Sequence, residues 1–331
     1  MTRPIVIDTD AGWDDWLALL FLMKRADLNI FGVTVTGAGE SHLTPGLKNL
    51  NQLLIFGGQA ADVYPGAPAP LSYSNAFPDS FRQTIDGLFG LTIPAAPGRR
   101  GTSKISTTSA SEFLYRTFCA AARRRVPVDV LAIGGFTNLA TQLRTNPLAA
   151  YRAGIGRIYA MAGTVNAPGN VVTPGDPVWS YYGSNTTAEW NVFIDPAAAA
   201  TVLGAGLDPL LVPLDATNDV PVTTRFVLGY RQAAGRDVYA GFVFDVLSQQ
   251  VGKTFFFDPL AAAVLATRAA KKLVTTKSLR VRVETALNEE RNRLGTLTFP
   301  TDGSGSRVTV CTRATAGAFE TLFRQTTLPR A

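Results

Sequence analysis

The chain has 331 residues, two cysteines, one histidine and a net charge of +6. A zinc site with two or more histidine ligands is therefore excluded, and two cysteines cannot form the disulfide framework of a small secreted protein. A mechanism that needs histidine would have to use His42. If the chain is an enzyme, carboxylates, an oxygen-bound metal or backbone dipoles must carry its chemistry.

The positive charge does not indicate a nucleic-acid partner. Its dense runs, at residues 99–100 and 123–125, are short and carry no interleaved aromatic residues. No apolar run approaches the roughly 20 residues that span a bilayer, so no membrane partner is expected. The first residues lack the features of a signal peptide, which makes a cytoplasmic location the default expectation.

The hydrophobic pattern predicts an α/β fold from the first residues onward. A β-branched run at residues 4–7 predicts a buried strand, and residues 16–25 predict a helix. A strand at 29–35 and a helix at 45–56 follow. This alternation is typical of parallel strands joined by crossover helices.

The alternation continues toward the C-terminus, although a long irregular stretch at 163–187 interrupts it. Helices are predicted at 110–125, 139–143, 195–203, 220–251 with breaks, 258–269 and from 314, and strands at 128–133, 157–161, 209–214, 279–283, 296–299 and 307–312. We therefore expect residues 1–331 to form a single domain. Its expected architecture is an open, largely parallel (mixed) sheet with helices on both faces, which is a Rossmann-like fold.

Four aspartates separate the first strand from the first helix, namely Asp8, Asp10, Asp14 and Asp15. In parallel α/β sheets, ligands bind at the carboxyl ends of the strands, where these residues would lie. Helix capping explains one or two of them, because the helix dipole offsets only about 0.3–1 kcal/mol per charge. A hard cation with oxygen ligands would relieve the repulsion among all four, and this predicts a metal site.

The segment Asp-Thr-Asp-Ala-Gly-Trp-Asp-Asp at residues 8–15 resembles the nucleoside hydrolase signature Asp-Thr-Asp-Pro-Gly-x-Asp-Asp. Phosphatases of the haloacid dehalogenase type share only the first Asp-x-Asp, and the lysine and acidic pair that they need downstream have no convincing equivalent here. Five further segments resemble the same family in its order: Ile-Gly-Gly-Phe-Thr-Asn-Leu-Ala at 133–140, Met-Ala-Gly at 161–163, Gly-Asn at 169–170, Ala-Glu-Trp-Asn at 188–191 and Phe-Asp-Pro-Leu at 257–260. Over residues 5 to about 270, the chain thus resembles the inosine-uridine preferring nucleoside hydrolases.

The resemblance implies Ca²⁺-dependent hydrolysis of the N-glycosidic bond of ribonucleosides, which yields free base and ribose. The implied Ca²⁺ ligands are Asp10, both oxygens of Asp15, Asp258 and the backbone carbonyl of Ile133. Asp14 would be the general base that takes a proton from the attacking water, and Asp8 would orient ligands or bound water. The implied ribose-binding residues are Asn170, Glu189, Asn191 and Met161.

Several of these residues also have a purely structural interpretation. Asp258 precedes Pro259 and could simply cap a helix. Asn170 could be a turn residue. Glu189 and Asn191 could lie on the surface at the edge of a strand.

The departures from the family pattern bear on the substrate. Phe257 stands where members that prefer inosine and uridine usually have a histidine, and the loop at 37–40 lacks their asparagine. The purine-specific (inosine-adenosine-guanosine) branch instead stacks the base between two aromatic rings, one of them in a segment resembling Phe-Pro-x-x-Trp-Arg. The chain has Phe-Pro-Asp-Ser-Phe-Arg at 77–82. We therefore expect Phe81 and Phe257 to stack a purine, although both could also be core residues.

The remaining candidates are less specific. Glu40 could contact the base or the ribose, or face solvent. Three aromatic residues of the long loop could form a lid or pack on a second subunit, namely Trp179, Tyr181 and Tyr182. Members of the family are typically dimers or tetramers, so a homo-oligomer is expected. Because the histidine and the loop asparagine are missing, a catalytically weak nucleoside-binding protein on the same fold is the alternative function.

Overall fold

A nine-stranded mixed sheet forms the centre of the described structure. The computed structural model describes residues 2–172, 185–252, 254–287 and 292–329. The strands are β1 (Arg3–Thr9), β2 (Leu28–Val35), β3 (Asp62–Pro65), β4 (Val128–Ala132), β5 (Ile155–Met161), β6 (Leu210–Val212), β7 (Val274–Val283), β8 (Leu297–Thr298) and β9 (Ser306–Ala314). They lie in the order β3-β2-β1-β4-β5-β6-β9-β7-β8. Strands β1 to β6 and β9 are parallel, whereas β7 is antiparallel to both β9 and β8.

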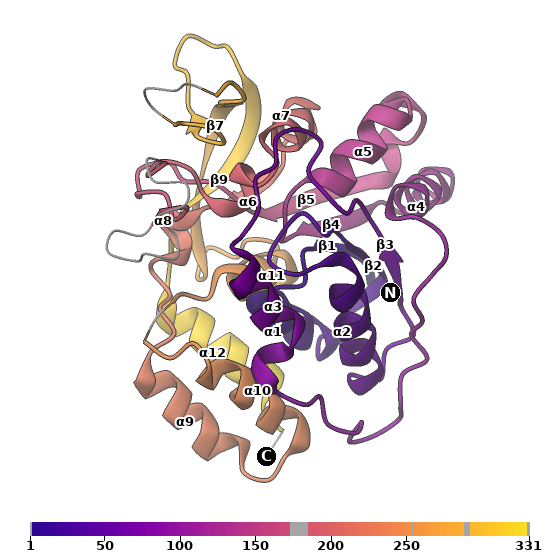
Figure 1. Ribbon diagram of the computed structural model, residues 1–331, viewed down its shortest axis with the longest axis vertical. Coiled ribbons are helices and arrows are strands. Elements are labelled where there is room, and N and C mark those ends of the chain that lie inside the picture. The colour runs from indigo at the N-terminus through magenta and orange to yellow at the C-terminus, as the bar shows by residue number, and fades with distance from the viewer. Residues whose placement is uncertain (1, 173–184, 253, 288–291, 330–331) are drawn as a thin grey trace.

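Helices cover both faces of this sheet. They are α1 (Trp13–Met23), α2 (Leu43–Phe56), α3 (Asp79–Asp86), α4 (Ala110–Arg124), α5 (Thr137–Thr145), α6 (Trp190–Phe193), α7 (Pro196–Gly204), α8 (Leu214–Thr217), α9 (Thr224–Ala234), α10 (Val238–Ser248), α11 (Phe257–Thr267) and α12 (Ala316–Thr327). Helices α4, α5 and α7 contribute to one buried core, and α1, α2, α10, α11 and α12 to the other. Figure 1 shows these two groups of helices apart from each other, with the parallel strands between them.

The first strand shows why both faces are covered. Successive side chains of a strand point to opposite faces, and Ile5 and Ile7 of β1 belong to one core while Val6 belongs to the other. All three side chains are at most 1% exposed. A strand buried on both faces has a continuous apolar sequence, which accounts for the β-branched run in β1.

The order of the strands reverses at β1. Strands β2 and β3 extend the sheet on one side of β1, while β4, β5 and β6 extend it on the other. Crossovers that leave such a point in opposite directions open a crevice outside the carboxyl ends of the two central strands. Asp10 follows β1, and Ile133 follows β4. Both residues therefore stand at the position where α/β sheets bind ligands.

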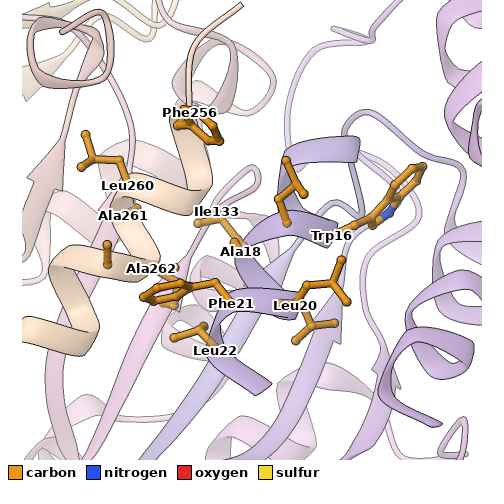
Figure 2. Close-up of a cluster of buried hydrophobic side chains, with 14 of the residues drawn as sticks. Trp16, Ala18, Leu20, Phe21, Leu22, Ile133, Phe256, Leu260, Ala261 and Ala262 are labelled. Atoms are coloured by element: carbon orange, nitrogen blue, oxygen red, sulfur yellow. The ribbon is translucent and has the colours of Figure 1, made fainter. Parts of the chain in front are cut away.

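Helices α1 and α11 pack against each other on one face of the sheet. Figure 2 shows Ala18 and Phe21 of α1 gathered with Leu260 and Ala262 of α11 in one buried cluster. Small residues at such a contact favour a short distance between helix axes. The pairing brings residues of α1 and residues more than 200 positions later in the chain into one core.

The structure confirms the predicted fold class of a largely parallel, mixed sheet with helices on both faces. The sequence patterns do not predict β3 or α3, because β3 has only four residues and α3 is short and largely polar. Strand β7 begins at Val274, before the predicted strand at 279–283. Its first half is mostly exposed, so backbone pairing with β9 defines it rather than a hydrophobic pattern.

None of the helices in the described parts of the chain combines the length and the apolar character needed to cross a membrane.

Asp195 joins three separate segments on the second face of the sheet. Its Oδ1 accepts a hydrogen bond from the N–H of Ala198 at 3.1 Å and so caps α7. Its Oδ2 accepts from the N–H of Leu71 at 2.7 Å and from the hydroxyl of Thr137 at 2.8 Å. The residue is fully buried, so water cannot replace these bonds if the carboxylate is removed.

We predict that Asp195→Ala lowers the free energy of unfolding by about 3 kcal/mol, because it leaves buried donors without a partner. Asp237→Ala is a matched control, since Asp237 caps α10 through a single bond to Ala240. Loss of a simple cap costs about 1 kcal/mol. Urea denaturation of both variants measures the difference. Equal losses for the two variants would contradict the network role of Asp195.

Candidate active site

Three buried carboxylates meet where helices α1 and α11 begin. Oxygen atoms of Asp14, Asp15 and Asp258 lie within 4.8 Å of one another, and each residue is at most 6% exposed. Asp14 and Asp15 stand in the first turn of α1, and Asp258 stands in the first turn of α11. The N-termini of both helices therefore direct partial positive charge toward this group.

Burial and mutual repulsion raise the pKa of every carboxyl in the group. Burial is the main cause for Asp14, whose pKa rises to about 7, and the charge of Asp10 adds to it. Burial, followed by the charges of neighbouring aspartates, holds the pKa of Asp15 and of Asp258 well above the usual range. Without a compensating positive charge, the folded protein disfavours full ionisation of the group.

Local hydrogen bonds hold Asp15 in place. Its Oδ2 accepts from the N–H of Gly12 at 3.0 Å, and its Oδ1 accepts from the hydroxyl of Thr9. Between them, Ala11 has a left-handed φ of 61°, and its N–H donates to Thr9 Oγ1 at 3.0 Å. Proline has a fixed negative φ and no N–H, so it could not adopt this turn. Alanine at this position, where the family signature has proline, is therefore consistent with the local backbone.

Asp10 is packed beneath the loop that follows β2. Its Oδ2 accepts from the N–H of Glu40 at 3.0 Å, and its backbone carbonyl accepts from the hydroxyl of Ser41 at 2.7 Å. A Cβ atom at Gly39 would lie 1.9 Å from Asp10 Oδ2, and one at Gly134 would lie 2.6 Å from Asp10 N. Both neighbours must therefore be glycine for the chain to approach Asp10 so closely.

Asp8 lies behind the cavity rather than in its lining. Its Oδ1 accepts from the hydroxyl of Thr34 at 2.7 Å and from the amide of Asn138 at 2.9 Å. Its backbone carbonyl accepts from the N–H of Ile133 at 2.8 Å, which joins the end of β1 to the end of β4. Burial raises the pKa of Asp8 to about 7. Asp8 thus ties together the segments that carry Asp10 and Ile133.

The group of carboxylates suits a hard divalent cation. Asp14, Asp15 and Asp258 offer closely spaced oxygen atoms, and Asp10 and Ile133 line the same cavity. Carboxylate and carbonyl oxygens are the ligands that Ca²⁺ and Mg²⁺ take in proteins. Capping alone does not account for Asp258, because it follows the N-cap position of α11, Phe256, by two residues.

A second set of polar residues lines the same cavity. The carboxylate of Glu189 caps α6 and accepts from the N–H groups of Gly163 at 2.9 Å, Asn191 at 2.8 Å and Val192 at 3.3 Å. Burial raises the pKa of Glu189 to about 7. The amide of Asn191 donates to the carbonyl of Met161 at 3.0 Å. Glu189 and Asn191 are buried at the start of a helix, so their interpretation as surface residues at a strand edge is wrong.

Asn170 is held against the same helix. Its side-chain oxygen accepts from the N–H of Trp190 at 3.0 Å, and its own N–H donates to the carbonyl of Ala188 at 3.0 Å. It lines the cavity together with Met161, Glu189 and Asn191. The structure therefore places the four predicted ribose-binding residues around one cavity, and their role toward a substrate stays a prediction.

Among the described residues, four aromatic side chains line the cavity: Trp13, Phe77, Trp190 and Phe257. The rings of Phe77 and Trp190 are stacked, with 3.9 Å between their centroids and an interplanar angle of 22°. Phe81 is not part of the lining. Its ring packs on that of Phe77, with 5.7 Å between the centroids. The residue of the 77–82 segment that faces the cavity is therefore Phe77, not Phe81 as we expected.

Glu40 lines the cavity, and its Oε2 is buried without a hydrogen-bond partner among the described residues. Burial and the charges of Asp14 and Asp10 hold its pKa well above the usual range. His42 is not among the lining residues, and its ring contacts Asp86 at 2.6 Å and Asp79 at 3.3 Å. Among the described lining residues, the polar side chains are therefore mainly carboxylates and amides.

The predicted lid residues lie outside the described part of the chain, namely Trp179, Tyr181 and Tyr182.

Sequence reasoning missed three aromatic residues and one cation near the site. Trp13 and Trp190 stand inside two of the motif segments, next to predicted site residues, and that adjacency was the available signal. Phe77 could not be separated from Phe81 without the orientation of α3. Arg82 contacts the loop beneath which Asp10 lies, and no pattern in the sequence indicates this.

Comparison with known proteins identifies the family. The model of the inosine-uridine preferring nucleoside hydrolases matches residues 5–321. The chain belongs to this family. Two members of the buried carboxylate group, Asp14 and Asp15, belong to the signature segment of the nucleoside hydrolases.

Curated members of the nucleoside hydrolase family are similar over much of this chain. Nucleoside hydrolase 3 of Arabidopsis thaliana is 26% identical over 78% of the chain and 33% of the relative. The pyrimidine-specific ribonucleoside hydrolase RihA of Escherichia coli is 28% identical over 67% of the chain and 63% of the relative. The matched region therefore covers about a third of the length of the Arabidopsis relative and somewhat under two thirds of the length of RihA.

A solved structure supports the fold. The inosine-uridine preferring nucleoside hydrolase from Bacillus anthracis superposes with a TM-score of 0.78 at 21% identity, over 98% of this chain and 99% of that chain. The nucleoside hydrolase fold therefore extends over nearly the whole chain.

We predict that the melting temperature of the metal-free protein falls by several degrees as the pH rises from about 5 to about 8. Burial raises the pKa of Asp8, Asp14 and Glu189 to about 7, so the folded protein keeps their protons at pH values where free carboxyl groups have lost them. The unfolded chain loses these protons first, so the stability that they provide at low pH is lost as the pH rises through the folded pKa. Calorimetry on chelator-treated protein measures the trend.

Two further measurements test whether the raised pKa values cause the fall in melting temperature. Glu189→Gln removes one of the titrating groups and should make the fall shallower. If the ionised carboxylates hold a divalent cation, adding one such as Ca²⁺ at pH 8 should recover much of the melting temperature, because it would bind the folded protein only. A melting temperature that stays constant or rises between these pH values would contradict the raised pKa values.

Proposed function

We propose that the protein is a Ca²⁺-dependent hydrolase of the N-glycosidic bond of ribonucleosides, with a preference for purines, and that it releases free base and ribose. The observation that carries this proposal is a buried carboxylate group, Asp14, Asp15 and Asp258, in one cavity with Glu189 and Asn191. A site of this kind combines a cation centre with groups that hydrogen-bond hydroxyls. Membership of the nucleoside hydrolase family supports it.

Asp10, Asp15, Asp258 and the carbonyl of Ile133 would hold the cation. When bound, Ca²⁺ would supply a positive charge that binds ribose hydroxyls and acidifies a water molecule. Asp14 is the general base in this proposal. Burial in the cavity raises the pKa of Asp14 and so favours its uptake of a proton.

The polar residues on α6 would bind the sugar. Glu189 is fixed by three backbone N–H groups, so its carboxylate cannot turn away when a hydroxyl approaches. Asn191 and Asn170 are likewise fixed by hydrogen bonds to backbone groups. A site built from such preorganised partners should reject a deoxyribose strongly, because its buried polar groups would be left unpaired.

The preference for purines rests on the aromatic lining. Phe257 cannot donate a proton to the departing base, which a histidine at this position could do. Phe77, Trp190, Trp13 and Phe257 line the cavity as aromatic partners for a base, and a purine presents a larger face for stacking than a pyrimidine. Stacking raises the basicity of N7, so that water can protonate the leaving purine.

A panel of ribonucleosides tests this function directly. Inosine, guanosine, adenosine, uridine and cytidine are assayed for ribose release with Ca²⁺ and with a chelator. We expect release from the purine nucleosides with Ca²⁺ and its loss with chelator. The similar RihA is named as pyrimidine-specific. If this protein also prefers uridine or cytidine, the purine preference is overturned, but the proposed hydrolase activity stands. Binding of nucleosides without release of base would instead identify a binding protein.

Two aspartate variants separate catalysis from cation binding. Asp14→Ala should lower kcat by about 10²- to 10⁴-fold, because it removes the general base, while Ca²⁺ binding persists. Asp10→Ala should abolish both activity and tight Ca²⁺ binding. Steady-state kinetics and calorimetric Ca²⁺ titrations measure the two effects. Near-normal turnover of Asp14→Ala would exclude Asp14 as the base.

The two phenylalanines of the 77–82 segment provide a matched pair. Phe77→Ala should raise KM for a purine ribonucleoside by roughly tenfold, since stacking on an aromatic ring contributes about 1–3 kcal/mol per base. Phe81→Ala removes the same side-chain atoms behind the cavity and should change KM much less. Kinetics with inosine compare the two variants. A larger effect at Phe81 would return the stacking role to that residue.

A further inference from the structure

The loop that follows β2 lies between Asp10 and helix α3. On one side, Glu40 N–H donates to Asp10 Oδ2 at 3.0 Å and the Ser41 hydroxyl donates to the carbonyl of Asp10 at 2.7 Å. On the other side, the Nη2 atom of Arg82 donates to the carbonyls of Gly37 at 2.7 Å and Ser41 at 2.8 Å. A single guanidinium nitrogen thus joins the two ends of the loop.

The loop has little room to adjust its position. A Cβ atom at Gly37 would lie 2.9 Å from Leu43 Cβ, and one at Gly39 would lie 1.9 Å from Asp10 Oδ2. Any displacement of the loop ends therefore moves the backbone that contacts the carboxylate of Asp10. Arg82 is well placed to control this displacement, because its side chain is half-buried and comes from a separate element.

Arg82 could also influence the site through its charge. Burial raises the pKa of Asp10, and the positive charge of Arg82 is the last of several influences that oppose this rise. Arg82 is the only cation among the main influences on the pKa of the described cavity carboxylates. A positive charge near a cation site weakens cation binding by repulsion. The hydrogen bonds and the charge of Arg82 therefore make opposite predictions for Ca²⁺ affinity.

We propose that Arg82 is a positioning residue for the cation-binding site: by bridging the carbonyls of Gly37 and Ser41, it holds the loop at 37–41 against Asp10. This inference rests on the proposed Ca²⁺ site, in which Asp10 is a ligand. The groups that orient metal ligands from behind contribute about 10- to 100-fold to metal affinity in other proteins. Arg82 acts on Asp10 indirectly, because it holds the loop whose groups donate hydrogen bonds to Asp10.

Calorimetric titration of chelator-treated, full-length protein with Ca²⁺ tests the inference. Arg82→Met keeps most of the aliphatic stem but removes the charge and the donors, and we expect the Kd for Ca²⁺ to rise about tenfold. Arg82→Lys keeps the charge and one donor group, and should recover part of the affinity. An unchanged or lower Kd for Arg82→Met would overturn the inference, since loss of the charge alone would tighten binding.

Two controls separate positioning from general destabilisation. Arg116→Met makes the same substitution at an exposed position of α4 and should leave the Kd unchanged. His42→Ala removes the ring contacts that join α2 to Asp79 and Asp86 of α3, but it leaves Arg82 in place. It should lower the melting temperature without raising the Kd. If the Kd rose as much in His42→Ala as in Arg82→Met, looser docking of α3 would by itself account for the weaker Ca²⁺ binding. That result would overturn the specific role of Arg82.

The outcome for the wild type distinguishes this inference from the proposed function. If the wild-type protein binds Ca²⁺ but releases no base, the function fails and the Arg82 variants still decide the inference. If it hydrolyses ribonucleosides without binding Ca²⁺, the inference falls and the hydrolase remains.

Discussion

The packing of α1 against α11 brings the N-termini of two helices to one point, and the rest of the site depends on this contact. Asp14, Asp15 and Asp258 come together there although burial and repulsion both oppose their ionisation. The two helices can hold them because their apolar faces share one buried core, as Figure 2 shows. The core thus provides the free energy that keeps like charges close, and a cation would remove the remaining repulsion.

The topology of the sheet extends this arrangement to more distant segments. Because the strand order reverses at β1, the ends of β1 and β4 meet at the same crevice, and the Asp8 carbonyl joins them through the N–H of Ile133. The next strand, β5, ends at Met161, whose carbonyl fixes Asn191. The ends of β1, β4 and β5 therefore each carry or support one part of the cavity, and the site is a consequence of the crossover pattern rather than of any single loop.

The sequence predicts those parts of the site whose residues lie close together along the chain. The aspartates at 8–15 could be placed because a strand, a turn and a helix follow directly in the chain, and the fold class follows from the same alternation. Asp258 was predicted only through the family resemblance, because its neighbours lie more than 200 residues away. The position of Phe77 in the lining could not be predicted, because the orientation of α3 depends on long-range contacts, including those of Arg82 with the loop after β2.

The lining of the cavity has two kinds of surface, and this division bears on how a substrate would lie. Many of the carboxylates and amides come from the starts of α1, α6 and α11 and from the loop after β2, whereas the aromatic side chains are Phe77, Trp190, Trp13 and Phe257. A ribonucleoside has the same division between a hydroxylated sugar and a flat base. With the chain's one histidine outside this lining, no imidazole is available to protonate the departing base. Under the proposed hydrolase function, the leaving group would therefore have to be one that water can protonate.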